Sequence, residues 1–174
     1  MGSIIKVNEY KDFNNNAIMT SDGAGVVTPN ASGIKNVPAF AAYLGANQTV
    51  ADATETKITV DTEVFDSDSA FSSNKFTVPS GQAGKYLINL SGKSDLAIDT
   101  YAYIFTAVNG TKVERSTQGS VKPNATGNVL LNSAVIVDLS VSDYVELFMY
   151  QNSGSSQLAY ADYCSLSGYK LIGA

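Results

Sequence analysis

Residues 84–91, Gly-Lys-Tyr-Leu-Ile-Asn-Leu-Ser, and residues 135–139, Val-Ile-Val-Asp-Leu, decide the fold class. Tyr86 and Ile88 in the first stretch and Val135, Ile136 and Val137 in the second are aromatic or β-branched residues, which favour strands. Both also place apolar side chains on each face of the pleat, as strands do in sheets that are covered on two sides. We therefore expect two long strands that are candidates for burial between subunits.

Seven more strand candidates flank these two along the chain. Turn-forming residues separate them, and Asn109-Gly110 is the strongest short-range hairpin signal. Such a succession predicts a β-sandwich or barrel with little room for helices. The nine predicted strands are Pro38–Leu44, Thr56–Phe65, Lys75–Val78, Gly84–Ser91, Tyr101–Val108, Lys112–Thr117, Asn132–Leu139, Tyr144–Gln151 and Tyr163–Ile172.

The composition indicates one domain with an oligomeric surface. A chain of 174 residues can bury one sizeable core. Charged residues make up 16% of the chain, against about 25% in ordinary soluble domains. A surface so poor in charge favours contact with identical chains.

The charge pattern argues against nucleic acid and membrane partners. The net charge is −5, and the 11 Lys and Arg residues are scattered, so no basic stripe can neutralise phosphates. No apolar stretch is long enough to insert into a bilayer. Residues 1–10 lack the basic start and apolar run of a secretion signal, so we expect folding in a cytoplasm. The single cysteine, Cys164, is expected to be a buried structural thiol.

The chain offers no catalytic constellation, and we expect neither an enzyme nor a cofactor. It contains no histidine, which removes the commonest general base and transition-metal ligand. The segment Asp66-Ser67-Asp68-Ser69 places oxygen ligands at alternate positions, as calcium loops do, but it lacks the glycine and distal glutamate of a calcium hand. A polar loop is the favoured interpretation over a calcium site. No catalytic, cofactor-binding or metal-ligating residue is therefore predicted.

Residues 1–36 form an arm that differs from the remainder. Short apolar segments alternate with the turn-forming clusters Asn14-Asn15-Asn16 and 21–25. Strands this short bury too little apolar area to offset the entropy of ordering them. The arm is therefore expected to be held by sister arms or by a larger assembly.

Residues 38–174 carry a recognisable family pattern, in five segments that keep the family's order: Phe76-Thr77-Val78-Pro79, Gly84-Lys85-Tyr86-Leu87, Val108-Asn109-Gly110, 139–147 (Leu-Ser-Val-Ser-Asp-Tyr-Val-Glu-Leu) and 167–172 (Ser-Gly-Tyr-Lys-Leu-Ile). The pattern resembles the globular head domain of complement component C1q, one of the tumour-necrosis-factor-like jelly rolls. The resemblance implies an all-β, ten-stranded jelly-roll sandwich at residues 37–174 that assembles as a homotrimer. Four residues on its strands are the expected trimer contacts: Tyr86, Ile88, Tyr169 and Leu171.

The arm has a resemblance of its own. Residues 3–12, Ser-Ile-Ile-Lys-Val-Asn-Glu-Tyr-Lys-Asp, together with Asn16-Ala17-Ile18 and Ser21-Asp22-Gly23, look like the N-terminal segment of structural and fibre proteins of tailed bacteriophages. The resemblance implies a virion protein that is assembled in the host cytoplasm and bound to capsid, neck or tail proteins. The expected docking residues are Ile4, Ile5, Val7, Tyr10, Ile18 and Met19.

Together these features predict a non-enzymatic, homotrimeric surface component of a phage virion, either a capsid decoration (cement) protein or a short head or tail fibre. The alternative is a trimeric, lectin-like protein that binds a host receptor or surface glycan. The ten tyrosines, including Tyr101, Tyr103, Tyr150, Tyr160 and Tyr163, leave this alternative open, because exposed tyrosines can stack on sugar rings. In strands, tyrosines are more often core or interface residues.

Overall fold

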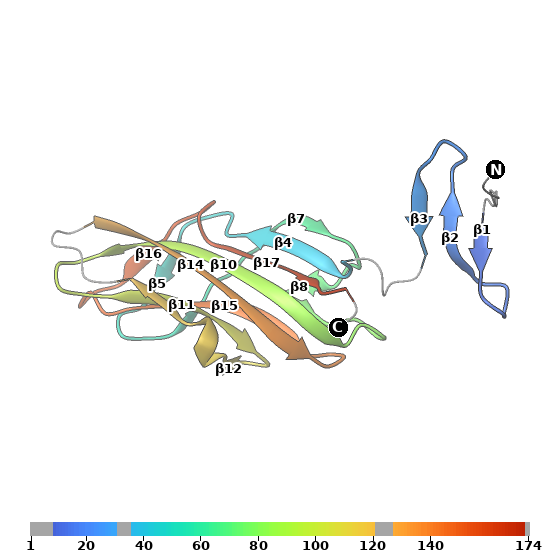
Figure 1. Cartoon of the computed structure of the whole chain (residues 1–174). Coiled ribbons are helices and arrows are strands. Elements are labelled where there is room, and N and C mark those ends of the chain that lie inside the picture. Colours follow the sequence, from blue (N-terminus) through green and yellow to red (C-terminus); the bar gives the residue numbers. More distant parts are fainter. Residues whose placement is uncertain (1–8, 31–35, 121–126, 173–174) are drawn as a thin grey trace, which may run out of the picture.

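The computed structural model describes residues 9–30, 36–120 and 127–172. Within them, residues 36–172 form a β-sandwich of two sheets that face each other, and residues 9–30 form a small sheet of their own (Figure 1). The expected docking residues Ile4, Ile5 and Val7 lie outside the described residues.

The first sheet is built around the two strands that the sequence singled out. β10 and β14 pair antiparallel over 13 residues each, from Gly84 opposite Leu139 to Leu96 opposite Gly127. The strand order of this sheet is β5-β16-β10-β17-β4-β7, and β14 pairs with β10 outside this order. The bounds are β4 Ala39–Tyr43, β5 Gln48–Val50, β7 Thr62–Asp66, β10 Gly84–Leu96, β14 Gly127–Leu139, β16 Gln157–Ala159 and β17 Ser165–Lys170.

The second sheet has the order β12-β11-β15-β9-β8, with β13 paired to β11 and β6 paired to β15. A short 3-10 helix, η2 (Glu114–Ser116), follows β12. The bounds are β6 Thr56–Lys57, β8 Phe71–Ser72, β9 Lys75–Thr77, β11 Ala102–Val108, β12 Thr111–Lys112, β13 Gln118–Ser120 and β15 Tyr144–Gln151.

Aromatic rings join the two sheets in the core. Phe40 of β4 and Phe76 of β9 stack with ring centroids 4.3 Å apart, and Tyr86 of β10 packs on Phe76 at 5.6 Å. All three side chains are fully buried. The Tyr86 hydroxyl donates a hydrogen bond to the Gln82 carbonyl at 2.6 Å, so its polar atom is satisfied.

Two predicted strands are interrupted in the structure. The segment Thr56–Phe65 divides into β6 and β7, because Ile58 and Val60 turn into the core between them. The segment Lys112–Thr117 begins as β12 but continues as η2, in which the Ser116 side chain is buried and its hydroxyl donates a hydrogen bond to the Val113 carbonyl at 2.6 Å. The prediction of continuous strands at these two places is wrong.

The arm is a three-stranded antiparallel meander, β1 (Glu9–Lys11), β2 (Ala17–Ser21) and β3 (Val27–Pro29). Side-chain hydrogen bonds close its two turns: Asp12 accepts from the backbone of Asn14 and Asn16, and Asp22 accepts from that of Ala24 and Val26. The Asp12 pKa is lowered chiefly by its hydrogen bonds to Asn16. These local contacts set the turns but bury no core.

Candidate functional surfaces

The outer face of the first sheet combines a centre of small side chains with rims of large apolar ones. Along β10 the side chains alternate between buried and half-buried, so Leu87, Asn89 and Ser91 point away from the core. The register places Asn89 opposite both Ala134 and Ser167, and Ser167 opposite Ala41. A flat, nearly uncharged centre results.

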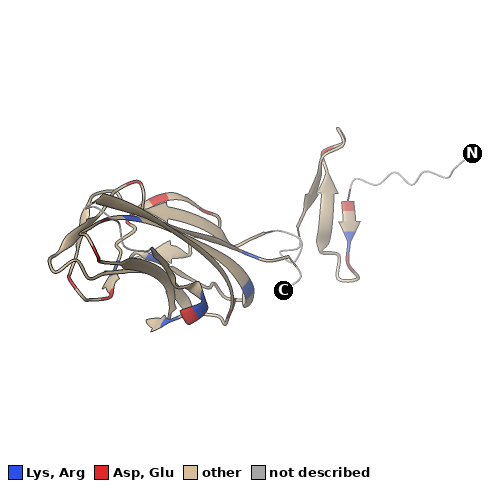
Figure 2. Ribbon diagram, turned by 60° about the vertical axis from the view of Figure 1, so that its left-hand side comes forward, with Lys and Arg blue, Asp and Glu red and all other residues tan. Residues whose placement is uncertain are grey.

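Large apolar side chains stand at both edges of this outer face. On β14, Leu130 is 65% exposed and Ile136 is 51% exposed. On β7, at the opposite edge, Phe65 is 50% exposed and lies opposite Ala41 of the outer face, while the neighbouring Val64, 64% exposed, sits at a bulge in this pairing. Figure 2 shows how thinly charged residues are spread over the long strands of the sandwich. Aliphatic area left open in this way is typical of a surface that another protein covers.

The four expected trimer contacts fall in different environments. Tyr86 and Ile88 are fully buried in the core of a single chain, so neither side chain can reach a neighbouring chain. Their assignment to the interface is corrected: the residues beside them, Leu87 and Asn89, occupy the outer face. Tyr169 is half-buried on that face, directly opposite Leu87, and Leu171 is half-buried beyond the end of β17. The sequence alone left the choice of face open because both faces of β10 carry apolar residues.

The arm leaves one apolar face without a cover. Tyr10 lies opposite Met19, which lies opposite Pro29, and Val27 and Ala17 share this side of the meander through the strand alternation. Tyr10 is 53% exposed, and Ile18, at 38%, points to the other side. The structure therefore brings Tyr10 and Met19 together but separates both from Ile18.

The outer face of the second sheet carries an aromatic ladder, made of Tyr101, Tyr103, Phe105, Phe148 and Tyr150. Tyr103 and Tyr150 are cross-strand partners whose rings stack at 4.7 Å with an interplanar angle of 8°. Tyr101 continues the stack at 5.6 Å from Tyr150, and Phe105 stacks on Phe148 at 5.3 Å. Tyr101 is the most open member, at 44% exposure, while Phe105 is buried.

A polar network borders the aromatic ladder. The Tyr103 hydroxyl donates to Glu55 at 3.0 Å, and the Lys112 ammonium pairs with the same carboxylate at 3.1 Å. Lys112 also lies 4.4 Å from the centre of the Tyr103 ring. Burial, followed by the hydrogen bond to Glu55, raises the pKa of Tyr103. The pKa of Tyr150 is also raised, first by its hydrogen bond with Tyr101.

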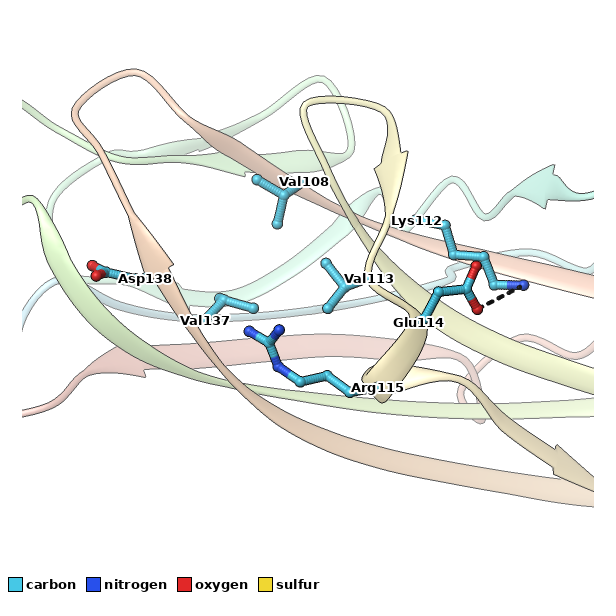
Figure 3. Close-up of a pocket in the computed structure, with 7 residues that line it drawn as sticks. All are labelled: Val108, Lys112, Val113, Glu114, Arg115, Val137 and Asp138. Atoms are coloured by element: carbon cyan, nitrogen blue, oxygen red, sulfur yellow. Dashed lines mark ion pairs between the residues drawn. The ribbon is translucent and has the colours of Figure 1, made fainter.

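A shallow pocket of about 560 Å³ lies where η2 and β12 approach β14 (Figure 3). Val108, Val113 and Val137 form its apolar part. Its cations are already engaged: Arg115 donates to the Ile136 carbonyl at 3.1 Å, and Lys112 pairs with Glu55 and, at 3.9 Å, with Glu114. Glu114 and Asp138 add carboxylates to the lining, which includes no histidine.

The described residues contain no cluster of three or more acidic or sulfur ligands that could hold a metal. In the segment Asp66-Ser67-Asp68-Ser69, the Asp66 carboxylate instead accepts backbone hydrogen bonds from Asp68 at 3.2 Å and Phe71 at 2.6 Å. Its oxygens close a turn, which agrees with the polar-loop interpretation. Among the same residues, no helix is long and apolar enough to cross a membrane.

Comparison with solved structures identifies the fold. The globular domain of zebrafish complement 1qA aligns at 14% identity over 77% of this chain and 97% of its own, with a TM-score of 0.51. Eiger TNF from S. frugiperda aligns at 11% identity over 79% and 95%, with a TM-score of 0.52, and murine APRIL at 15% identity over 76% and 99%, also with a TM-score of 0.52. No protein-family model and no curated protein matches the chain.

These alignments define the class of the head: an all-β jelly roll of the type shared by the complement C1q head and tumour-necrosis-factor-like proteins. The expected all-β jelly-roll sandwich is thereby confirmed, and the homotrimer stays a prediction. At identities of 11–15%, the likeness concerns the fold alone.

Proposed function

We propose that this protein is a non-enzymatic, homotrimeric structural component of a tailed-bacteriophage virion, with residues 37–174 as the trimeric head and residues 1–36 as the arm that anchors it. The observation that carries the trimer is the outer face of the first sheet. Its apolar rims, Leu130 and Ile136 on one side and Phe65 on the other, are left open by a single chain.

The shape of this face favours a ring over a two-fold dimer. The β14 rim projects large aliphatic side chains, whereas the centre, around Ala41, Asn89 and Ser167, is lined by small ones. The rim of one chain can therefore pack on the centre of the next. Such a head-to-tail contact joins two different surfaces, and it closes into a ring when the rotation between subunits allows. Three subunits is the number implied by the family that the sequence resembles.

The virion role is supported by the arm. Its sequence resembles the N-terminal segment of phage structural proteins, and its apolar face, with Tyr10 and Met19, has no cover within the described chain. Three arms joined in one trimer would bind a symmetric or repetitive shell far more tightly than a single arm. As a decoration protein the trimer would bridge coat subunits, and as a fibre it would display the head outward.

The trimer is tested by the solution mass of the protein, measured by light scattering. We expect three times the chain mass of 18.3 kDa, unchanged over a wide range of concentration. A monomer would refute the proposed assembly.

The virion role is tested separately, by mass spectrometry of phage particles that are purified on a density gradient from a lysate of infected host cells. Peptides of this chain should co-migrate with intact particles in a fixed ratio to the coat protein. Their confinement to the soluble fraction would refute a virion role and leave the trimer unaffected.

A further inference from the structure

The aromatic ladder on the second sheet is chemically different from the outer face of the first sheet. The rims of the first sheet are largely aliphatic, whereas the open end of the ladder consists of the three tyrosines Tyr101, Tyr103 and Tyr150. Tyrosine offers a flat apolar ring and a hydroxyl that both donates and accepts hydrogen bonds. This combination matches a ligand that has C–H faces as well as hydroxyl groups.

The loops beside Tyr101 add hydrogen-bonding groups to this end of the ladder. The Tyr101 backbone N–H donates to the Asn152 side chain at 2.8 Å, and the loop at Asp52 bridges to Gln151. The carboxylates of Asp52 and Glu55 are close enough to contribute to the raised pKa of Tyr150. Carboxylates accept hydrogen bonds from hydroxyl donors without needing a charged partner.

The charge around the ladder selects against anionic ligands. Lys112 is held by Glu55 at 3.1 Å while lying over the Tyr103 and Phe105 rings, and Lys57, the cross-strand partner of Phe148, pairs with Glu146 at 2.6 Å. The carboxylates of Asp52, Glu55, Glu114 and Glu146 outnumber these two cations locally. A sulfated or sialylated glycan would meet net negative charge here, and a neutral one would not.

The ladder also has a structural role, because cross-strand aromatic pairs stabilise a sheet. That role accounts for Tyr103 with Tyr150 and for Phe105 with Phe148, which are direct partners on β11 and β15. Tyr101 shares this role through its stack on Tyr150, but it precedes β11, has no cross-strand partner in the ladder and leaves 44% of its surface open.

We propose that Tyr101, together with Tyr150 and the acceptor groups of Asp52 and Glu55, forms a binding site for neutral pyranose oligosaccharides. The open ring of Tyr101 stacks on the C–H face of a sugar, and the carboxylates accept from its hydroxyls. The site lies within one chain and does not depend on the proposed trimer or on the virion role.

The test is a glycan array that contains neutral, sulfated and sialylated oligosaccharides, followed by titration of the best neutral glycan. The chain contains no tryptophan, so its intrinsic fluorescence comes from its tyrosines and reports their contacts directly. We expect selective neutral hits, and loss of affinity by about tenfold or more in Tyr101→Ala because the stacking surface is removed.

Tyr163→Ala is the matched control. Tyr163 is 50% exposed, and the centre of its ring lies 4.2 Å from the ammonium of Lys93, a residue of the first sheet. Its replacement should leave the affinity unchanged within about twofold, and circular dichroism should show that both variants are folded. Absence of neutral hits, a preference for anionic glycans, or equal losses in the two variants would each overturn the proposal. A light-scattering measurement on the same sample shows independently whether the trimer is present.

Discussion

At the scale of single residues, Gly168 of β17 is fixed by close packing. A methyl group added at this position would lie 2.8 Å from Ile88 Cδ1, 2.8 Å from the Leu87 carbonyl oxygen and 3.1 Å from the Phe40 ring. The backbone oxygen cannot move aside without disturbing the β10–β17 pairing. We therefore expect Gly168→Ala to destabilise the fold by about 1–3 kcal/mol in urea unfolding, the usual cost of overpacking.

Gly127, at the start of β14, provides the control for this substitution, because a methyl group there meets nothing within 4 Å. Gly127→Ala should change the unfolding free energy by less than about 0.5 kcal/mol. Equal effects of the two substitutions would show that strand propensity, and not the contact with Leu87 and Ile88, decides the outcome at Gly168.

Tyr103 makes the stability depend on alkaline pH. Burial and the hydrogen bond to Glu55 raise its pKa in the folded chain, whereas an unfolded tyrosine ionises near pH 10. The unfolded chain therefore loses this proton first. The contribution of the protonated Tyr103 hydroxyl to the free energy of unfolding is complete below about pH 10 and is lost as the pH rises towards the pKa of Tyr103 in the folded chain. Urea midpoints should fall above about pH 10, and less steeply in Tyr103→Phe, which has no proton to lose. Parallel pH profiles for the two proteins would contradict this assignment.

Side-chain direction is where residue-level prediction from the sequence was weakest. The pattern at 84–91 correctly predicts a strand, but it does not show which of the two faces is the core. Tyr86 and Ile88 were assigned to the trimer contact, yet both are fully buried within one chain. Tyr86 packs against Phe76 of β9, which in turn stacks on Phe40 of β4, so its direction depends on contacts with other strands. Apolar residues at successive positions carry no signal that distinguishes the two faces.

At the scale of elements, local signals predicted the long strands well and the interruptions poorly. Asn109-Gly110 joins β11 to β12, as the hairpin signal indicated, and both residues have positive φ, at 52° and 75°. The division of 56–65 into β6 and β7 depends on Ile58 and Val60 entering the core, which is a tertiary effect. Short segments such as β5 and β16 exist through pairing with each other, so their own sequences hold little evidence for them.

The strand β14 is the element on which the proposed trimer depends most. Ile136 is 51% exposed and lies opposite Leu87 on the outer face. A lysine at position 136 should change the stability of a single chain little, because the side chain faces solvent. In the trimer it would place an unpaired charge in the contact between chains. We expect Ile136→Lys to convert the trimer to folded monomers, as measured by light scattering and circular dichroism. Val141→Lys, in the turn before β15 and 44% exposed, should remain trimeric. A trimeric Ile136→Lys protein would exclude β14 from the contact.

At the scale of the whole molecule, the division into arm and head follows from how much each part buries. The head joins Phe40, Phe76, Tyr86 and many aliphatic residues into one core, whereas the arm has three strands of three to five residues and leaves Tyr10 and Phe13 in solvent. Alternating apolar segments and turn clusters were enough to predict this contrast. The partner that covers the arm could not be derived in the same way, because an open apolar face specifies its area and not its occupant.

This division predicts that the arm and the head lose their functions independently. Because the head has a core of its own, a chain that begins at Val37 should unfold at the same temperature as the main transition of the full-length protein, measured by calorimetry.

Met19→Lys places a charge in the centre of the apolar face of the arm, opposite Tyr10 and Pro29. We expect this variant to keep the head transition and the trimeric mass but to be lost from purified particles. Thr28→Lys, on the other side of the meander, is the control that should still be incorporated. A lower head transition in either arm variant would show that arm and head fold as one unit.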